Sequence, residues 1–276
     1  MTYDLQEASV EVTGRVRALG ALLPADGRLS WVADGVEGHV PLHCYLINTL
    51  DGSILLDSGI PVHEEIVLAQ LSRYLPKDNR LTLVLSRIVE FDSFGNAATV
   101  LERYLCEKVF SQFPVLEWVY YRHIHDCAAR LAKPIWEPLQ GGLQITVPES
   151  DSVVLEVIDA PIRLLATWWF YEPEGRVLFT SDSFGHVPYR CLSDPVCVTD
   201  AGDITTHEDV RNHMLAKFDW VEFADTRPLK EQLREIFESR PIEVIAPSYG
   251  RPIVGESLVR KHYEMMQSVL EDLGSF

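Results

Sequence analysis

The chain of 276 residues carries 24 basic and 41 acidic residues, which gives a formal net charge of −17 at pH 7. This charge argues against a protein that binds nucleic acid or an anionic membrane, because the phosphate groups of both repel an acidic surface. Hydrophobic residues make up 47% of the chain, which is enough for a large core. We expect one domain over residues 1–276, although two would also suit this length.

The sequence lacks the features of exported and membrane-spanning proteins. Residues 1–4 do not begin a secretory signal, and the most apolar stretch, residues 164–171, is far too short to cross a bilayer. The five cysteines are scattered without a CxxC pair, so reduced thiols are favoured over a zinc cluster. These observations predict a cytoplasmic protein.

The first half of the chain combines strands with helices. Alternating or apolar runs predict strands at residues 10–17, 29–32, 41–48, 53–57 and 81–88. An Asp-Gly turn joins the third and fourth of these strands into a hairpin. Apolar residues at helical spacing predict helices at residues 63–74, 94–104 and 115–131.

The second half opens with strands and ends with helices. Strands are predicted at residues 153–158, 163–171, 176–180 and 243–245. Helices are predicted at residues 208–223, 228–239 and 254–273. Two mixed sheets flanked by helices would bury the apolar faces of all these elements, so we expect an α/β fold built as an αββα sandwich.

Four short segments resemble, in order, the metallo-β-lactamase-like domain of flavodiiron and oxygen-binding diiron proteins. The segment at 45–59 resembles that family's opening hairpin and Asp-Thr-Gly turn, and 88–96 resembles its His-x-Glu-x-Asp-His-Ser-Gly-Asn motif. The segment at 179–186 is similar to Ser-x-Asp-Ala-Phe-Gly, and 245–250 to Ala-Pro-Ser-His-Gly. The chain has no flavodoxin segment, so the resemblance implies the stand-alone form of the domain.

The resemblance implies a metal site whose acids are present. Carried over position by position, Glu90, Asp92 and the bridging Asp182 are the family's carboxylate ligands. Three carboxylates without imidazole suit a hard cation and bind it weakly, whereas histidine ligands suit iron and zinc. We therefore expect no cofactor or a weakly bound divalent metal, with iron, zinc and manganese left open.

The four histidine ligands of the family are replaced in this sequence. Ile88, Ser93 and Tyr249 stand at three of these positions, and a gapless count backwards along the strand places Arg163 at the fourth. Since three converging carboxylates repel one another, a cation, a raised pKa or a base must compensate. Arg87 and Arg163 are the candidates for a built-in counter-charge, and Arg163 is also a candidate catalytic residue.

Other polar residues are candidates for a role at the site. His186 follows the Asp182 turn and could act as a ligand or a base, while Tyr249 could donate a hydrogen bond to a substrate oxygen. The alternatives are structural: Asp92 or Ser93 could cap the helix near residue 94, Asp182 could be a turn residue, and Tyr249 could simply be packed.

Two further features of the sequence have both a functional and a structural interpretation. His123 and His125 suggest a metal site, but residues two apart on a helix point about 200° away from each other, which disfavours shared coordination. Aromatic residues cluster at 110–121 and 168–171, where they could line a pocket, form a subunit contact or pack in the core.

Three functions are compatible with these observations. The favoured one is the metal-poor subunit of a hetero-oligomeric hydrolase that acts on a small substrate such as an aromatic ether or ester, beside a paralogous subunit with an intact site. Two-component hydrolases of this fold that cleave nitroaryl methyl ethers are a known setting of this kind. The alternatives are a stand-alone enzyme with a rebuilt carboxylate site including His186, and a sensor or ligand-binding protein.

Overall fold

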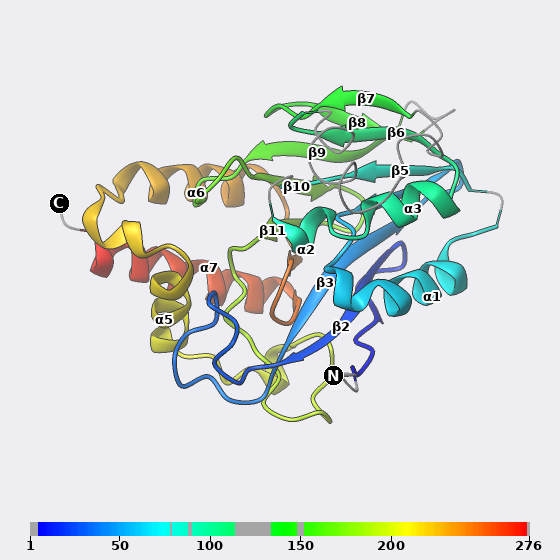
Figure 1. Ribbon diagram of the computed structural model, residues 1–276. Helices are drawn as coiled ribbons and strands as arrows, with labels where there is room; N and C mark the ends of the chain where they lie inside the picture. Colours follow the sequence, from blue (N-terminus) through cyan, green and yellow to red (C-terminus); the bar gives the residue numbers. More distant parts are fainter. Residues whose placement is uncertain (1–4, 78, 88–89, 114–133, 148–151, 275–276) are drawn as a thin grey trace.

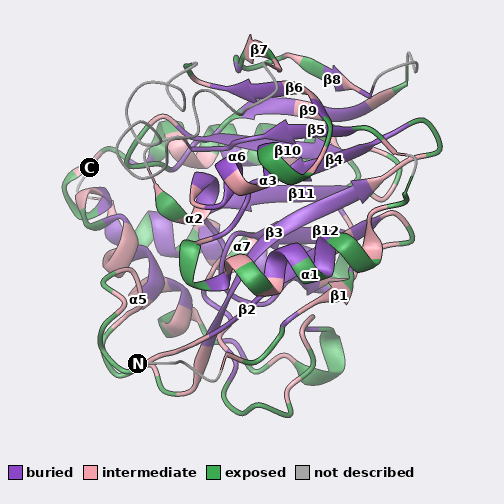
Figure 2. Ribbon diagram, turned by 45° about the vertical axis from the view of Figure 1, so that its right-hand side comes forward, coloured by how far each residue is buried: buried purple, intermediate pink, exposed green. Residues whose placement is uncertain are grey.

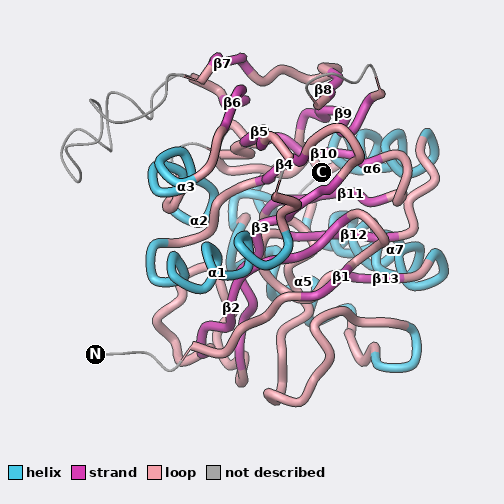
Figure 3. Tube along the Cα trace, turned by 90° about the vertical axis from the view of Figure 1, so that its right-hand side faces the viewer, coloured by secondary structure: helices cyan, strands magenta, loops and turns pink. Residues whose placement is uncertain are grey.

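The computed structural model describes residues 5–77, 79–87, 90–113, 134–147 and 152–274 (Figure 1). Two mixed β-sheets of seven and six strands lie face to face, with helices on both outer sides (Figures 1 and 3). This arrangement is the αββα sandwich that the sequence predicts. None of the helices in these ranges is long and apolar enough to span a membrane.

The seven-stranded sheet is formed by the first half of the chain. Its strands, in spatial order, are β1 Val10–Glu11, β2 Val16–Pro24, β3 His39–Asn48, β4 Ser53–Leu56, β5 Leu81–Val84, β6 Cys106–Ser111 and β7 Ile135–Pro138. Pairing is antiparallel from β1 to β4 and parallel from β4 to β7. Helices α1 (Glu64–Tyr74) and α3 (Ala97–Arg103) bury apolar residues against its outer face.

The six-stranded sheet is formed by the second half of the chain. Its strands, in spatial order, are β13 Ile253–Val254, β12 Val244–Pro247, β11 Val177–Ser181, β10 Trp168–Glu172, β9 Val153–Asp159 and β8 Gln144–Thr146. Only β11 and β12 among these neighbours run parallel. Helices α5 (His207–Lys217), α6 (Arg227–Ser239) and α7 (Glu256–Leu273) belong to its outer layer.

Side chains on β10 show why both faces of this sheet are buried. Successive residues of a strand point to opposite faces, so Trp169 packs in the outer cluster with α5, α6 and α7, while Phe170 packs between the sheets. Both side chains are almost completely buried. Figure 2 shows the same pattern across the molecule, with buried strands and with exposed residues on helix surfaces and in loops.

Several predicted elements differ from the observed ones. The predicted strand at residues 10–17 is two strands, because a turn closed by Val12 and Val16 separates β1 from β2. The strand predicted at 29–32 is wrong, since these residues form turns within the loop between β2 and β3. The strand predicted at 163–171 begins only at Trp168. Strands β6, β7 and β8 were not predicted, and the helix predicted at 115–131 lies outside the described residues.

Two predicted helices are interrupted. The helix predicted at 94–104 is a short α2 (Phe91–Phe94) followed by α3. The helix predicted at 208–223 ends at Lys217, and a 3-10 segment, Asp219–Phe223, follows it. Thr206 and Asp209 form a capping box that begins α5, which fixes the direction in which this helix leaves its loop.

Candidate functional site

Three carboxylates converge where the two sheets meet at one end of the sandwich. Glu90 immediately precedes α2, Asp92 lies within α2, and Asp182 directly follows β11 of the other sheet. One oxygen of each lies within 4.8 Å of the others. The structure therefore brings together the three residues that the sequence suggested as metal ligands.

The guanidinium group of Arg87 lies among these carboxylates and contacts all of them. Its Nη1 donates to Glu90 Oε2 at 2.6 Å and to Asp182 Oδ1 at 2.5 Å, and its Nη2 donates to Asp92 Oδ2 at 2.8 Å. The Arg87 side chain is fully buried, with 0% exposure. One of the two arginines proposed as a counter-charge thus supplies that charge.

Lys217 adds a second cation that the sequence analysis missed. It ends α5, and its Nζ lies 3.3 Å from both Glu90 Oε2 and Asp182 Oδ2. Two protein cations therefore face three carboxylates. The i, i+4 spacing of His213 and Lys217 places both on one face of α5, and this was a signal in the sequence that could have identified them.

Burial is the largest influence on the pKa of Asp182 and on that of Arg87. It raises the pKa of Asp182 to about 6, against the opposing effect of Arg87 and then Lys217. Burial disfavours the charged form of Arg87 as well, but Asp182, followed by Asp92 and Glu90, raises the pKa of the guanidinium well above its ordinary value. Arg87 is consequently a permanent cation at this site.

Hydrogen bonds to Asp57 position the loop that carries Arg87. The buried Asp57 carboxylate accepts from Ser86 N at 2.8 Å, from Ser86 Oγ at 2.7 Å, and from Ser93 Oγ. Ser93 Oγ also accepts from Arg87 N at 3.2 Å. Ser93, at one former histidine position, is thus part of the scaffold, and α2 has no side-chain cap of the kind considered for Asp92 or Ser93.

Arg163 does not reach the cluster. It lies in the loop between β9 and β10 with an exposed side chain, so its prediction as a counter-charge or catalytic residue is not supported by its position. The gapless count placed it on the strand, but β10 starts five residues later at Trp168. Ile88, His123 and His125 lie outside the described residues.

Tyr249 and His213 lie beside the cluster. The Tyr249 ring is buried, with its centroid 5.9 Å from Lys217 Nζ, and its hydroxyl has no hydrogen-bond partner among the described residues. His213 Nε2 lies 3.1 Å from the main-chain oxygen of Asp182. Burial is the main cause that lowers the pKa of His213 to about 4, so this ring is neutral at pH 7.

His186 does not rescue a metal-ligand position. It is buried, and its Nε2 lies 2.8 Å from His262 Nδ1 on α7. The planes of the two rings are nearly parallel, with an interplanar angle of 9°, as suits a hydrogen bond between the ring nitrogens. Within the described ranges, the only group of three or more potential ligands that converges closely is Glu90, Asp92 and Asp182, so His186 belongs to a different polar region.

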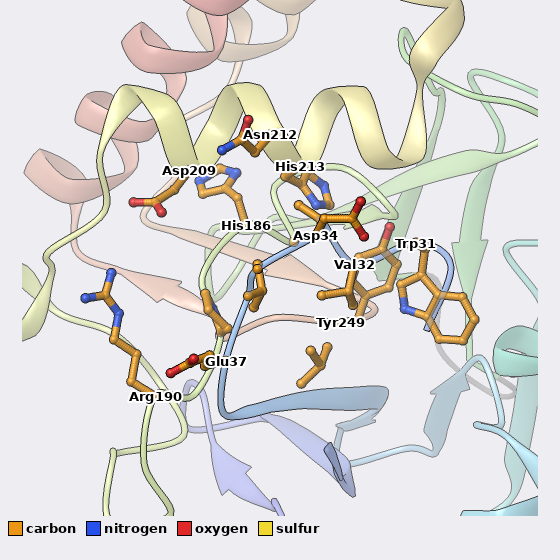
Figure 4. Close-up of a pocket in the computed structure, with 16 residues that line it drawn as sticks. Trp31, Val32, Asp34, Glu37, His186, Arg190, Asp209, Asn212, His213 and Tyr249 are labelled. Atoms are coloured by element: carbon orange, nitrogen blue, oxygen red, sulfur yellow. The ribbon is translucent and has the colours of Figure 1, made fainter. Parts of the chain in front are cut away.

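A cavity of about 400 Å³ opens next to Tyr249 and His213. It is bordered by the loop of residues 25–38, by α5 and by the turn that carries His186 (Figure 4). Trp31 closes one side of this cavity beside Tyr249. The sequence analysis did not identify this loop as part of a site, because its contacts depend on long-range packing.

The residues present do not fit a pair of iron or zinc ions held by imidazole. Ser93 and Tyr249 stand where the resemblance would place histidine ligands, and each of the three carboxylates is bonded to a protein cation. A divalent ion would have to displace the Arg87 guanidinium before it could reach these oxygens.

Comparisons with known proteins give the fold its context. No protein-family model and no curated protein matches the sequence. Among solved structures, rubredoxin oxygen:oxidoreductase from Desulfovibrio gigas is similar with a TM-score of 0.64 at 14% identity, over 95% of this chain and 61% of that protein. This chain therefore spans about three fifths of that protein's length.

Two shorter proteins match over almost their whole length. A fragment of a putative diflavin flavoprotein from Nostoc sp. PCC 7120 has a TM-score of 0.65 at 14% identity, with 98% of both chains covered. A metallo-beta-lactamase from Pontibacter korlensis has a TM-score of 0.57 at 16% identity, over 97% of this chain and 100% of that one. The chain has the metallo-β-lactamase fold, in a form similar to that of flavodiiron proteins.

Proposed function

We propose that this chain is a metal-independent component of a metallo-β-lactamase-fold hydrolase, in which a paralogous subunit carries the metal ions. The observation that supports this proposal is the buried Arg87 guanidinium bonded to Glu90, Asp92 and Asp182. A protein cation in this position neutralises the carboxylates, but unlike a metal ion it is not a Lewis acid. The reaction chemistry would then come from the partner.

The energetics of the cluster favour this assignment. Each hydrogen bond to a charged group contributes roughly 1.5–3 kcal/mol, so withdrawing Arg87 from its carboxylates is costly. An entering ion would also meet an oxygen-only donor set, which suits manganese better than iron or zinc. We expect divalent metals to bind weakly to the chain, if they bind at all.

Exposed aromatic side chains close in sequence to the cluster residues support a partner surface. Phe91, between Glu90 and Asp92, is 52% exposed, and Phe223, at the end of the 3-10 segment after α5, is 78% exposed. Aromatic residues are enriched in subunit contacts. A small aromatic ether or ester is the proposed substrate class of the assembly, since aromatic rings also border the nearby cavity.

Co-expression with a paralogue that carries histidine at all four ligand positions tests this function. We expect a stable complex whose metal, measured by elemental analysis after gel filtration, follows the paralogue. The isolated chain should carry only traces of metal and no hydrolase activity. Near-stoichiometric iron or zinc in the isolated chain, or failure of every four-histidine paralogue to bind, would contradict the proposal.

A ligand-binding or sensor protein is the second candidate, and the cavity beside the cluster favours it. Buried polar atoms of three lining residues, Tyr249 Oη, Trp31 Nε1 and His186 Nδ1, have no hydrogen-bond partner among the described residues. Such atoms are costly unless a ligand or water satisfies them. If instead the isolated chain hydrolysed substrates and Asp182→Asn abolished that activity, a stand-alone enzyme with a rebuilt site would replace both candidates.

A further inference from the structure

A row of rings runs from α7 along the cavity wall to the loop of residues 25–38. Neighbouring ring centroids are 5.1, 5.9, 5.8 and 6.4 Å apart along the row. The rings belong, in order, to His262, His186, His213, Tyr249 and Trp31. All except His262 line the cavity, and Figure 4 shows these four around it.

The surroundings of His262 favour one tautomer at this end of the row. Its Nε2 has no hydrogen-bond partner among the described residues, but it lies 3.4 Å from Asp203 Oδ2, and a lone pair facing this carboxylate would be repelled, so a proton on Nε2 is favoured. Although burial opposes it, hydrogen bonds from Lys261 and Thr205 lower the pKa of Asp203 to about 2, so this residue is a carboxylate. His262 Nδ1 is then an acceptor, and His186 Nε2 donates to it.

Two histidines of the cavity wall, His186 and His213, each have an unprotonated ring nitrogen that can accept a hydrogen bond. Since His186 carries its proton on Nε2, its Nδ1 presents a lone pair, and this buried atom has no partner among the described residues. His213 must donate through Nε2 to the main-chain oxygen of Asp182, so the Nδ1 of His213 is also an acceptor. Two imidazole lone pairs therefore belong to neighbouring residues that line one cavity.

Charges around the cavity favour a cation. Asp34, Glu37 and Asp209 line it, against the single guanidinium group of Arg190. Aromatic faces, such as those of Trp31 and Tyr249, attract cations as well. A chain with a net charge of −17 also raises the local concentration of small cations.

We propose that this cavity binds a small organic ammonium ion. Its N–H groups donate to His186 Nδ1 and His213 Nδ1, and its hydrocarbon part packs against Trp31 and Tyr249. The cavity of about 400 Å³ lies in the size range of small-molecule sites. This inference rests on the ligand-binding candidate and does not depend on the role as a hydrolase subunit.

Calorimetric titration with four matched compounds tests the proposal. Benzylammonium should bind with a dissociation constant of about 1 mM or tighter, as expected for a ligand of so few atoms. Benzyltrimethylammonium keeps the charge but has no N–H group, so it loses both hydrogen bonds. It should bind at least about 10-fold more weakly, since about 10-fold corresponds to the loss of one hydrogen bond alone. Benzyl alcohol and toluene should bind more weakly than benzylammonium.

Variants connect the binding to the proposed acceptors. His186→Leu should weaken benzylammonium binding about 10-fold or more, while His207→Ala, a change at a partly exposed histidine at the start of α5, should leave it unchanged. His262 is a positioning residue: His262→Asn keeps an acceptor for His186 Nε2, whereas His262→Leu removes it. Side-chain ¹⁵N NMR should show an unprotonated His186 Nδ1 in the wild type and in His262→Asn, and a mixed tautomer in His262→Leu.

The outcomes separate this inference from the function on which it rests. Equal binding of benzyl alcohol, toluene and benzylammonium would overturn the ammonium assignment and leave a ligand-binding protein. No binding of any of the four compounds would overturn both. Zinc binding that is lost in His186→Leu, without binding of benzylammonium, would replace the ammonium ion by a metal.

Discussion

Two polar regions lie side by side in this protein and are satisfied in opposite ways. In the acidic cluster, Arg87 and Lys217 contact at least one oxygen of each of the three carboxylates. In the row of rings, polar atoms that include His186 Nδ1 and Tyr249 Oη have no partner among the described residues. The two regions meet at Asp182, whose carboxylate belongs to the cluster and whose main-chain oxygen bonds to His213.

The difference indicates which region receives a ligand. Buried polar groups in folded proteins are almost always bonded, so a buried site with its own counter-ions has little to gain from a ligand. A site with unpaired acceptors beside a cavity gains hydrogen bonds when a ligand enters. The similarity to flavodiiron proteins suggests that a ligand binds at the acidic cluster. The contacts of the described residues suggest instead that it binds at the row of rings.

Among the variants considered, removal of the Arg87 guanidinium from the acidic cluster should change the free energy of unfolding most. Arg87→Leu leaves three carboxylates without their main counter-charge, and breaking a buried ion pair costs about 3–5 kcal/mol. We expect a loss of that size in the free energy of unfolding, measured with urea. Added manganese should restore part of the stability of this variant and should not change the wild type.

A surface ion pair provides the matched control. Arg80→Leu breaks the contact to Glu107, in which the arginine is 46% exposed, and should cost less than about 1 kcal/mol. If Arg87→Leu were no more costly than Arg80→Leu, the acidic cluster would not depend on its guanidinium group.

Unfolding at acidic pH should test whether the buried histidines are neutral in the folded protein. Burial is the main cause that lowers the pKa of His43 to about 3 and those of His63 and His262 to about 4. The pKa of histidine in the unfolded chain is about 6.5. Above this pH the neutral rings contribute fully to stability, and this contribution is lost as the pH falls towards about 4. We expect a decrease of a few kcal/mol in the free energy of unfolding between about pH 7 and pH 4.

Asp182 acts with the opposite sign. Its folded pKa of about 6 lies above its ordinary value of 3.8, so its contribution is lost as the pH rises between these values. Asp57 and Glu172 act in the same direction as Asp182, because burial also raises the pKa of their carboxyl groups. We expect the five described histidines with a lowered pKa to outweigh these acids, since His186 and His213 add to the three above. His63→Gln should therefore flatten the decrease towards acid, and an increase in stability on acidification would contradict the neutral assignment.

The second cation of the cluster should matter less than the first. Lys217 is 10% exposed and its contacts are 3.3 Å long, so Lys217→Met should cost roughly 1–3 kcal/mol in urea unfolding. The double variant with Arg87→Leu tests coupling. Costs that simply add would mean that the two cations do not share the charge of the same carboxylates.

The smallest effect is expected for Tyr249→Phe. The Tyr249 hydroxyl is buried without a partner among the described residues, so its removal breaks no hydrogen bond. We expect a change of less than about 1 kcal/mol in either direction. A larger loss would mean that this hydroxyl is bonded in solution, for example to an ordered water molecule, and that this side of the cavity is already satisfied.

The sequence predicted the fold well where the signal was local. The hairpin of β3 and β4 followed from a turn between apolar runs, and the layers followed from the resemblance of four segments. Strands β6, β7 and β8 were missed because they are short and mix polar with apolar residues. Their position in the sheets depends on neighbours that are distant in the chain.

The candidate site, like the fold, was predicted only in part from the sequence. Glu90, Asp92 and Asp182 followed from motif positions, and the expected repulsion among them led to Arg87 as a counter-charge. The predicted role of Arg163 at the site is not supported, because its position was counted back along a strand that begins only at Trp168. The contacts of His262 depend on how α7 packs beside the turn after β11, and no local pattern encodes that packing.

Arg87 also joins the two halves of the chain. It follows β5 of the first sheet, and its bond to Asp182 after β11 of the second sheet closes a loop of 95 residues. Contacts of such long sequence separation form late, because the entropy of closing the loop must be overcome first. Glu90 and Asp92 are close to Arg87 in the chain, but the guanidinium group reaches Asp182 only when both sheets have come together, so the formation of this bond would mark the final stage of folding.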